Sequence, residues 1–269
     1  MTRYKHFFGF QREPFPQDIK VEDLYPLPGL KALADRFQYA LELGAISVIT
    51  GEVGTGTGKS TSLRHASSPL HPSEYRIIPV TANTGTILEL LKQILLSLQV
   101  ESRCLSITLL TKTLRGLISE ITAKKQRPVL IIDEAHLMRI EVFAQFHTLL
   151  QFDFDSKPLV PLILCGQNTL LDKLMYHSSR PLASRVVGRS HLEGLTLKEM
   201  EGYLNHHLRI AGVKEQLFTE EAILAIQQGS GGLLRRANHL ARGALVAATL
   251  EKNRTVSAEH VRVASTEII

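Results

Sequence analysis

The sequence is poor in cysteine and contains no long apolar run. Its two cysteines, Cys104 and Cys165, are too few for a disulfide framework or for a metal site of their own. Cys165 ends an apolar run, so we expect its thiol to be buried and inert. No apolar stretch approaches the roughly 20 residues that span a bilayer, and no signal-peptide core follows Met1. These absences argue against secreted and membrane-spanning classes, and we expect a cytoplasmic protein without membrane contact.

Internal repeats and low-complexity segments are also absent, and the eleven histidines show no metal-ligand spacing. The 269 residues, 44% of them hydrophobic, suffice for one core-bearing domain with a smaller one, or for two medium domains. The 31 Lys and Arg exceed the 26 Asp and Glu by five, which is compatible with nucleic acid but also explained by solubility alone. Candidates for DNA phosphate contacts, each equally compatible with a solvated helix face, are Lys112, Arg115, Lys124, Lys125, Arg127, Arg236, Arg242, Lys252 and Arg254.

Hydrophobic periodicity predicts three parts. Residues 1–28 are rich in Phe and Pro and are expected to form an irregular strap packed on the domain surface. Over residues 29–194, strands and helices alternate, which predicts an α/β core built on a doubly wound parallel sheet. Residues 195–269 contain helical patterns only and predict a small all-helical C-terminal domain. The strands are expected at 45–50, 75–81, 128–132 and 159–165, and the helices at 30–43, 59–66, 87–98, 109–118, 141–151, 197–210, 219–228, 233–250 and 257–265.

The strongest motif is Gly51-Glu-Val-Gly-Thr-Gly-Thr-Gly-Lys-Ser60, between a predicted buried strand and a predicted helix. In such a loop, backbone N–H groups and the helix N-terminus cradle phosphate oxygens. Lys59 would reach the β and γ phosphates of ATP, and the Ser60 hydroxyl would bind Mg²⁺. Part of the segment 1–28 is a candidate cover for the adenine ring. We assign nucleotide binding to Gly51, Gly54, Thr55, Gly56, Thr57, Gly58, Lys59, Ser60 and Thr61.

The phosphate loop is two residues longer than the regular motif. That motif has four residues between its first glycine and the Gly-Lys-Ser/Thr triplet, whereas six residues separate Gly51 from Gly58 and Val53 occupies the expected glycine position. Two residues carry up to roughly 7 Å of extended chain. Either the insert bulges outward and leaves the cradle intact, or the pocket is altered and hydrolysis is weak. We expect nucleotide binding to be retained and leave hydrolysis open.

The second motif is Val129-Leu-Ile-Ile-Asp-Glu-Ala-His136, an apolar strand that ends in two acids. Asp133 would lie beside the bound Mg²⁺, usually through water. Glu134 would polarise the attacking water. The string that ends at His136 also occurs in helicases, but the other helicase motifs are absent.

These two motifs and the helical C-terminal domain resemble those of the AAA+ ATPases. Within that group the chain is most similar to the ExeA/GspA-type ATPases and to the allied transposition regulators of the TniB, TnsC and MuB types. The resemblance runs over nearly the whole chain and includes the opening Tyr4-Lys-His-Phe-Phe-Gly-Phe and the segments 163–167, 182–185, 203–212 and 231–238.

The resemblance implies three further site residues. Gln167, just after the fourth predicted strand, would be sensor 1, with Asn168 as the alternative. Arg185 would be an arginine finger that reaches the nucleotide of the next subunit, with Arg180 or Arg189 as alternatives. Arg235 would be sensor 2, with Arg236 as its rival; the family usually has proline before this arginine, where Leu234 stands here.

The resemblance also implies an ATP hydrolase that binds ATP and Mg²⁺ between the subunits of a ring or helical filament. Our primary expectation is a homo-oligomer that assembles on double-stranded DNA and regulates or targets a transposase. ExeA-type proteins continue into a membrane span and a peptidoglycan-binding region, whereas this sequence ends at Ile269, which favours that expectation. The alternatives are an ExeA/GspA-type ATPase of secretion-channel assembly and a nucleotide-binding scaffold with little hydrolysis.

Overall fold

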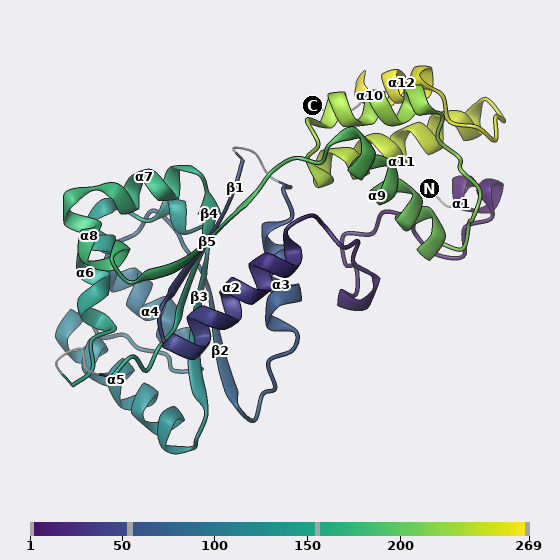
Figure 1. Ribbon diagram of the computed structural model, residues 1–269. Coiled ribbons are helices and arrows are strands. Elements are labelled where there is room, and N and C mark those ends of the chain that lie inside the picture. Colours follow the sequence, from purple (N-terminus) through teal and green to yellow (C-terminus); the bar gives the residue numbers. More distant parts are fainter. Residues whose placement is uncertain (1–2, 53–55, 154–156, 267–269) are drawn as a thin grey trace. The chain divides into compact units, whose positions relative to one another are not determined.

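The computed structural model describes residues 3–52, 56–153 and 157–266. The chain divides into two compact units. One is an α/β unit of residues Pro28–Val53 and Lys59–Leu192, and the other is a helical unit of Met1–Leu27, Gly54–Gly58 and Glu193–Ile269. Figure 1 shows the sheet of the first unit and the helices of the second.

A five-stranded sheet in the order β2-β3-β4-β1-β5 forms the centre of the α/β unit. All its strand pairs are parallel. The strands are β1 (Ile46–Gly51), β2 (Tyr75–Thr81), β3 (Arg127–Asp133), β4 (Leu162–Gln167) and β5 (Val186–Leu192). Every residue of β1 is buried, as expected for a central parallel strand covered on both faces. The sheet therefore confirms the predicted doubly wound α/β fold.

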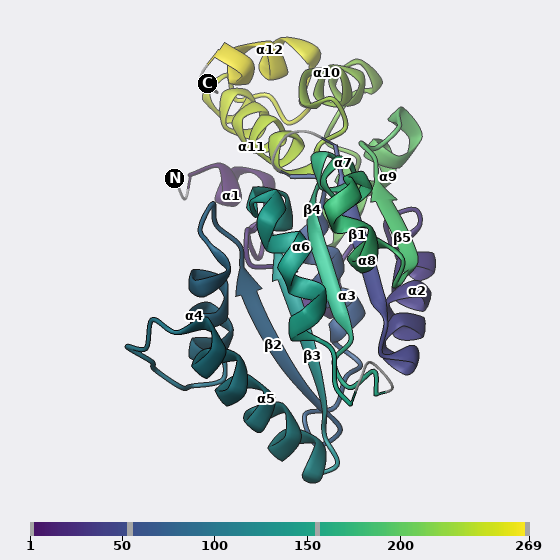
Figure 2. The same ribbon diagram turned by 90° about the vertical axis from the view of Figure 1, so that its left-hand side faces the viewer.

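Helices cover both faces of this sheet. Figures 1 and 2 show α2 and α3 on one face and α4, α5 and α6 on the other. The helices of this unit are α2 (Leu30–Leu43), α3 (Lys59–Ser67), α4 (Ile87–Ser97), α5 (Ile107–Ala123), α6 (Ile140–Leu149), α7 (Thr169–Met175) and α8 (Arg180–Ala183), with short 3₁₀ turns η2 (Ala135–Leu137) and η3 (His177–Ser179). Thr86 caps α4 in a capping box with Glu89, and Gly44 ends α2 in a left-handed conformation (φ 65°).

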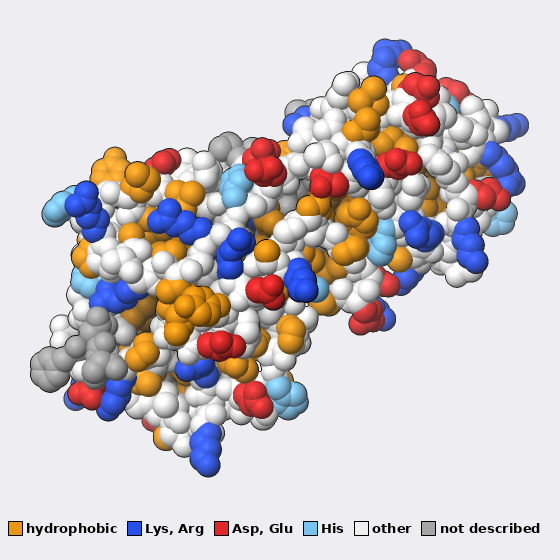
Figure 3. All heavy atoms as spheres, in the orientation of Figure 1, with side chains coloured by type: hydrophobic (Ala, Val, Ile, Leu, Met, Phe, Trp, Pro, Cys, Tyr) orange, Lys and Arg blue, Asp and Glu red, His pale blue; other side chains and the backbone are white. Residues whose placement is uncertain are grey.

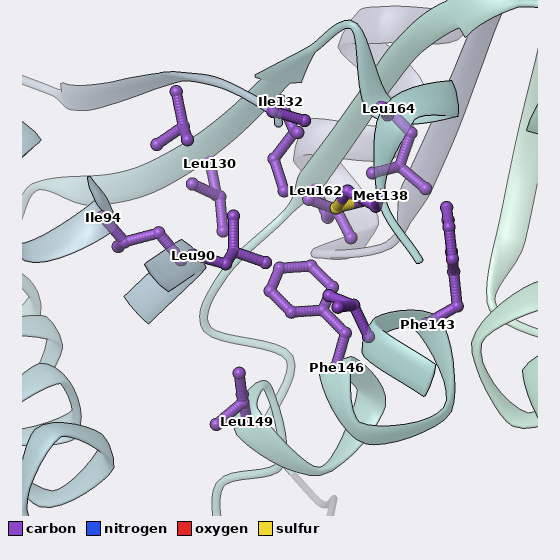
Figure 4. Close-up of a cluster of buried hydrophobic side chains, with 14 of the residues drawn as sticks. Leu90, Ile94, Leu130, Ile132, Met138, Phe143, Phe146, Leu149, Leu162 and Leu164 are labelled. Carbon is purple, nitrogen blue, oxygen red and sulfur yellow. The ribbon is translucent and has the colours of Figure 1, made fainter. Parts of the chain in front are cut away.

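Side chains along the central strands point alternately to the two faces of the sheet and contribute to two separate apolar cores. In β3, Leu130 and Ile132 point toward α4 and α6, where they pack with Phe143 and Phe146 (Figure 4). Val129 and Ile131 point to the opposite face and join the core that contains α2 and α3. This alternation is the period of two that a strand imposes on its side chains. Cys165 is fully buried in the second core, which confirms the expected burial of its thiol.

The helical unit has a core of its own. It contains α1 (Arg3–Phe8), the turn η1 (Val21–Asp23), α9 (Leu197–Ile210), α10 (Glu220–Ser230), α11 (Leu234–Leu250) and α12 (Ala258–Thr266). The Thr219 side chain accepts a hydrogen bond from Ala222 N and so caps α10. None of the helices in the described parts of the chain is long and apolar enough to cross a membrane.

The N-terminal segment belongs to the helical unit, whereas we expected residues 1–28 to form a separate irregular strap. It begins with the helix α1, and Phe8, Phe10 and Phe15 are buried in the core of the helical unit. The Phe15 ring stacks on His207 of α9 with ring centroids 5.3 Å apart. His207 Nδ1 also lies 2.7 Å from the carbonyl oxygen of Pro14. These contacts explain the difference, because burial of several aromatic rings fixes the segment.

The sheet also contains one strand that the sequence analysis did not predict. The edge strand β5 alternates exposed and buried residues and includes Gly188, Arg189 and His191, so it lacks the apolar run that marks the central strands. The short helices α7 and α8 were not predicted either. The fourth strand begins at Leu162 instead of the expected residue 159, since Pro161 lacks an N–H to donate to a ladder.

Candidate functional site

Several of the predicted site residues lie at the carboxyl edge of the parallel sheet. Gly51 ends β1 and lies opposite Gln167, which ends β4. Asp133 ends β3 and lies opposite Thr81, the last residue of β2. Ligands of open α/β sheets bind in the crevice outside the carboxyl ends of the strands. Three neighbouring strands thus place an acid, an amide and the start of the phosphate loop at one edge.

The phosphate loop joins β1 to α3. The predicted ligands Gly54 and Thr55, and Val53 beside them, lie outside the described residues. Gly56 and Gly58 have φ angles of 118° and 89°, which side chains disfavour. The helix α3 begins at Lys59, directly after the loop in the sequence, and the N-terminus of a helix favours anions. This arrangement supplies the backbone donors and the positive end of a helix that a phosphate group requires.

The Ser60 hydroxyl and the Asp133 carboxylate meet at this edge. Ser60 Oγ donates to Asp133 Oδ2 over 3.2 Å, and Asp133 Oδ1 accepts the backbone N–H of Glu134 over 2.8 Å. Ser60 is exposed, so the oxygen pair is open to a ligand. Hydroxyl and carboxylate oxygens are the donors that Mg²⁺ prefers. The two residues therefore fit the predicted magnesium site. The predicted nucleotide-binding residue Thr61 follows Ser60 in the first turn of α3.

Glu134 has an unusual backbone conformation. Its φ and ψ of 53° and 30° lie in the left-handed region, which costs a residue with a side chain about 1–2 kcal/mol. Its carboxylate is partly exposed, and Oε2 lies 3.3 Å from Nδ1 of His136. Such strain clusters where the surrounding structure requires a particular direction of a side chain. The position next to Asp133 and the exposed carboxylate suit a group that accepts a proton from water.

The strand β4 contributes Gln167 and leads into α7. Gln167 is half-buried at the end of the strand, and Asn168 is exposed at the start of the helix. Two residues earlier, burial raises the pKa of the Cys165 thiol, and the nearby Asp133 carboxylate adds to this. The thiol therefore stays protonated beside the site. Lys173 of α7 donates from Nζ to the carbonyl oxygens of His136 and Met138.

Arg185 does not join this cluster. It precedes β5, and its carbonyl oxygen accepts the N–H of Ile46, the first residue of β1. It thus lies at the amino edge of the sheet, about 16 Å along β1 from Gly51 at the usual rise per strand residue. Its Nη1 donates to the carbonyl oxygen of Pro181. The alternative Arg180 is exposed in α8, and Arg189 lies along β5 opposite Val48.

Arg235 lies in the helical unit, at the second position of α11. Its backbone N–H points to the carbonyl oxygen of Gly56 in the same unit, with N and O 3.4 Å apart. Arg236 is the next residue of the same helix and is exposed.

Four of the basic candidates for DNA contacts have partners within the chain, and one of them, Arg254, lies over the Phe7 ring, 5.8 Å from its centroid. Arg115 donates to Thr148 O and lies over the Phe152 ring. Arg127 donates to Leu41 O, and Arg242 donates to Glu13 and to the carbonyl oxygen of Phe15. On the face shown in Figure 3, Lys and Arg side chains are interspersed with Asp and Glu and form no single basic surface.

Sequence reasoning missed two residues that contact the site. His136 ends the acidic motif, and its position three residues after Asp133 is a usable signal in the sequence. Lys173 gave no signal, because its two carbonyl partners lie 37 and 35 residues away in the chain. Only the packing of α7 against the turn after β3 brings them together.

Comparisons with known proteins agree with this geometry. Residues 42–175 match the family model described as AAA domain. General secretion pathway protein A of Aeromonas hydrophila is 28% identical over 267 residues, which cover 98% of this chain and 48% of that protein. The chain thus spans about half the length of this curated relative.

Solved structures share the fold at low identity. The Cdc6p structure from Pyrobaculum aerophilum superposes with a TM-score of 0.71 at 17% identity and covers 98% of this chain and 71% of that one. A chain of the Drosophila ORC structure bound to DNA gives a TM-score of 0.70 at 15% identity, with 99% of this chain and 66% of that one covered. At such identities the likeness establishes the fold, a parallel sheet with helices and a C-terminal helical region. The family match assigns residues 42–175 of this chain to the AAA domain family, and the motif geometry agrees with that assignment.

Proposed function

We propose that this chain binds ATP and Mg²⁺ at the carboxyl edge of its sheet and uses the nucleotide to control assembly with copies of itself. The observation that carries the proposal is the contact of Ser60 Oγ with Asp133 Oδ2 at 3.2 Å, directly beside Lys59 and Glu134. Bound Mg²⁺ would neutralise charge on the phosphate oxygens. The loop amides and Lys59 would hold those phosphates.

In this proposal Glu134, Gln167 and Arg185 each have a defined role. Glu134 accepts a proton from the attacking water, and Gln167 orients that water from the neighbouring strand. Arg185 lies at the opposite edge of the sheet, so it is too far away to serve the nucleotide of its own chain. Its guanidinium suits the phosphates of a neighbouring copy, because its forked donors match phosphate oxygens. Hydrolysis would then require assembly.

We propose further that this assembly serves a general secretion pathway. The support is the relative of that name, which matches 98% of this chain. This support favours the secretion alternative over our primary expectation of a transposition regulator. A second candidate, assembly on duplex DNA, is favoured by the net charge of +5 and by a fold shared with a chain of a DNA-bound complex.

Sedimentation velocity tests the core of the proposal. Wild-type protein, E134Q and R185A are each measured with ATP, with ADP and without nucleotide, while ATP turnover is followed in parallel. We expect ATP to raise the sedimentation coefficient of the wild type and of E134Q. The sedimentation coefficient of R185A should not rise with ATP, and its ATP turnover should be reduced roughly a hundredfold. R103A, which removes an exposed arginine far along the chain from the motifs, is the matched control. Equal assembly and turnover in R185A would contradict a finger acting between copies.

The same experiment separates the two candidate partners. A duplex oligonucleotide is added at low and at raised salt, since phosphate contacts weaken steeply as salt rises. Assembly with ATP alone, unchanged by the duplex, supports the secretion proposal. Assembly that appears only with the duplex and disappears at raised salt supports DNA. Loss of secretion from cells that lack the protein, restored by wild type but not by E134Q, tests the pathway itself.

A further inference from the structure

His136 lies beside the proposed water-activating carboxylate and has an unused ring nitrogen. Its side chain is 10% exposed, and Nδ1 lies 3.3 Å from Glu134 Oε2. Yet Nδ1 is buried and has no hydrogen-bond partner of acceptable geometry among the described residues. A buried polar atom without a partner is uncommon and calls for an explanation. Catalytic hydrogen bonds in ligand-free sites are often misaligned and tighten only with substrate.

The ring of His136 is held by the strand that ends in Gln167. A β carbon built on Gly166 would lie 3.0 Å from the backbone nitrogen of His136, 3.2 Å from Nδ1 and 3.3 Å from its β carbon. Real β carbons rarely approach other atoms so closely. The imidazole therefore packs directly on the backbone of β4, and only glycine at position 166 leaves room for it.

The backbone of His136 is held by the helix that follows this strand. Lys173 Nζ donates to the carbonyl oxygens of His136 and Met138. Two carbonyl acceptors for one partly buried ammonium group fix the turn η2 against α7. Both the ring and the main chain of His136 are thus placed by the β4–α7 segment, which contains the proposed sensor Gln167.

We propose that His136 is a positioning residue, which sets the place of the Glu134 carboxylate by donating a hydrogen bond from Nδ1 to Oε2 when nucleotide is bound. The inference rests on the proposed function, because it concerns the same carboxylate. It adds a physical link between β4 and the water-activating group. Displacement of a reacting group by 1 Å can cost a hundredfold in rate, so a rigid neighbour that fixes one carboxylate oxygen has a large effect on turnover.

Three substitutions of His136 separate positioning from packing. In H136N, the side-chain nitrogen occupies the place of Nδ1, whereas in H136Q it occupies the place of Nε2. H136A removes the donor altogether. We expect H136A and H136Q to lower kcat roughly ten- to a hundredfold, and H136N to stay within about threefold of wild type. KM for ATP is expected to change less than about twofold in all three, because the phosphate contacts remain.

Controls keep the outcomes distinct. H71A replaces an exposed loop histidine and is expected to match wild type. The thermal midpoint of unfolding and the affinity for a non-hydrolysable ATP analogue are measured for every variant. The inference is wrong if H136N loses as much kcat as H136A, or if all three variants turn over like wild type. If wild type itself binds no ATP, the proposed function fails and this inference fails with it; if wild type is active, the His136 variants decide the inference alone.

Discussion

The Ser60 hydroxyl donates to Oδ2 of Asp133 although 73 positions separate the two residues in the chain. The contact joins the first turn of α3 to the end of β3. The other carboxylate oxygen accepts the N–H of Glu134, so the carboxylate is oriented from two sides. A pair of oxygen donors is therefore in place before any cation binds, as a small hard cation requires.

Removal of this hydroxyl tests the magnesium site. In S60A, we expect the affinity for ATP in the presence of Mg²⁺ to fall at least about tenfold, because one cation ligand is lost. Affinity measured with a chelator present should be unchanged, since Lys59 and the loop amides remain. Titration of a fluorescent ATP analogue with and without Mg²⁺ provides the measurement. S119A, which removes an exposed helix serine whose hydroxyl donates to Arg115 O, serves as control.

The left-handed backbone conformation of Glu134 leads to a prediction about the stability of two variants. At φ 53° the backbone of a glycine is relaxed and that of an alanine is strained. The free energy of unfolding should therefore be about 1 kcal/mol larger for E134G than for E134A. Both variants lack the carboxylate and should hydrolyse ATP at least a hundredfold more slowly than wild type. Urea unfolding of the two variants gives the comparison. If E134A is the more stable of the two, the left-handed conformation at this position is incorrect.

Deletion of two residues tests the elongated phosphate loop. Removal of Thr55 and Gly56 restores Gly-Glu-Val-Gly-Thr-Gly-Lys-Ser, the regular spacing. If the extra dipeptide bulges outward, as we expect, the shortened protein and the wild type bind ATP with affinities that differ by less than about threefold. Any gain in the shortened protein should then appear in kcat alone. A shortened protein that binds ATP more than about tenfold more tightly would mean that the natural loop distorts the cradle.

The buried His207 predicts acid sensitivity of the helical unit. Burial lowers its pKa from 6.5 to about 4, so the unfolded chain binds more protons than the folded one between these values. The free energy of unfolding therefore falls as pH drops from about 6.5 to 4, by up to about 3 kcal/mol from this group.

The variant H207N isolates the contribution of His207. Its amide can still donate to Pro14 O at the place of Nδ1, but it cannot take up a proton. Chemical unfolding at pH 7 and pH 4.5 should give a loss of stability about 2 kcal/mol smaller in H207N than in wild type. Comparison of the two proteins cancels the pH-dependent contributions that they share. Parallel pH profiles of the two proteins would contradict the assignment.

Local patterns in the sequence determined the α/β order, the helical C-terminal unit and the phosphate and acidic motifs. The central strands could be predicted because parallel strands buried on both faces must be apolar along their length. The edge strand β5 could not, since it alternates exposed with buried residues and includes Gly188. The N-terminal segment was expected to be an irregular strap, yet its aromatic rings find partners some 190 residues away, such as His207 for Phe15.

Only the tertiary structure decided which site residues meet. It joins Ser60 to Asp133, brings His136 against Gly166 and Lys173, and places Arg185 at the opposite edge of the sheet from Gly51. Residue type and spacing report on neighbours within a turn or a strand, because backbone geometry repeats over a few residues. Contacts across 30 to 70 residues depend on strand order and on the packing of helices between strands, which no local pattern encodes. The residue types that supply the chemistry of the site could therefore be predicted from the sequence, whereas the distances between them are set by the fold.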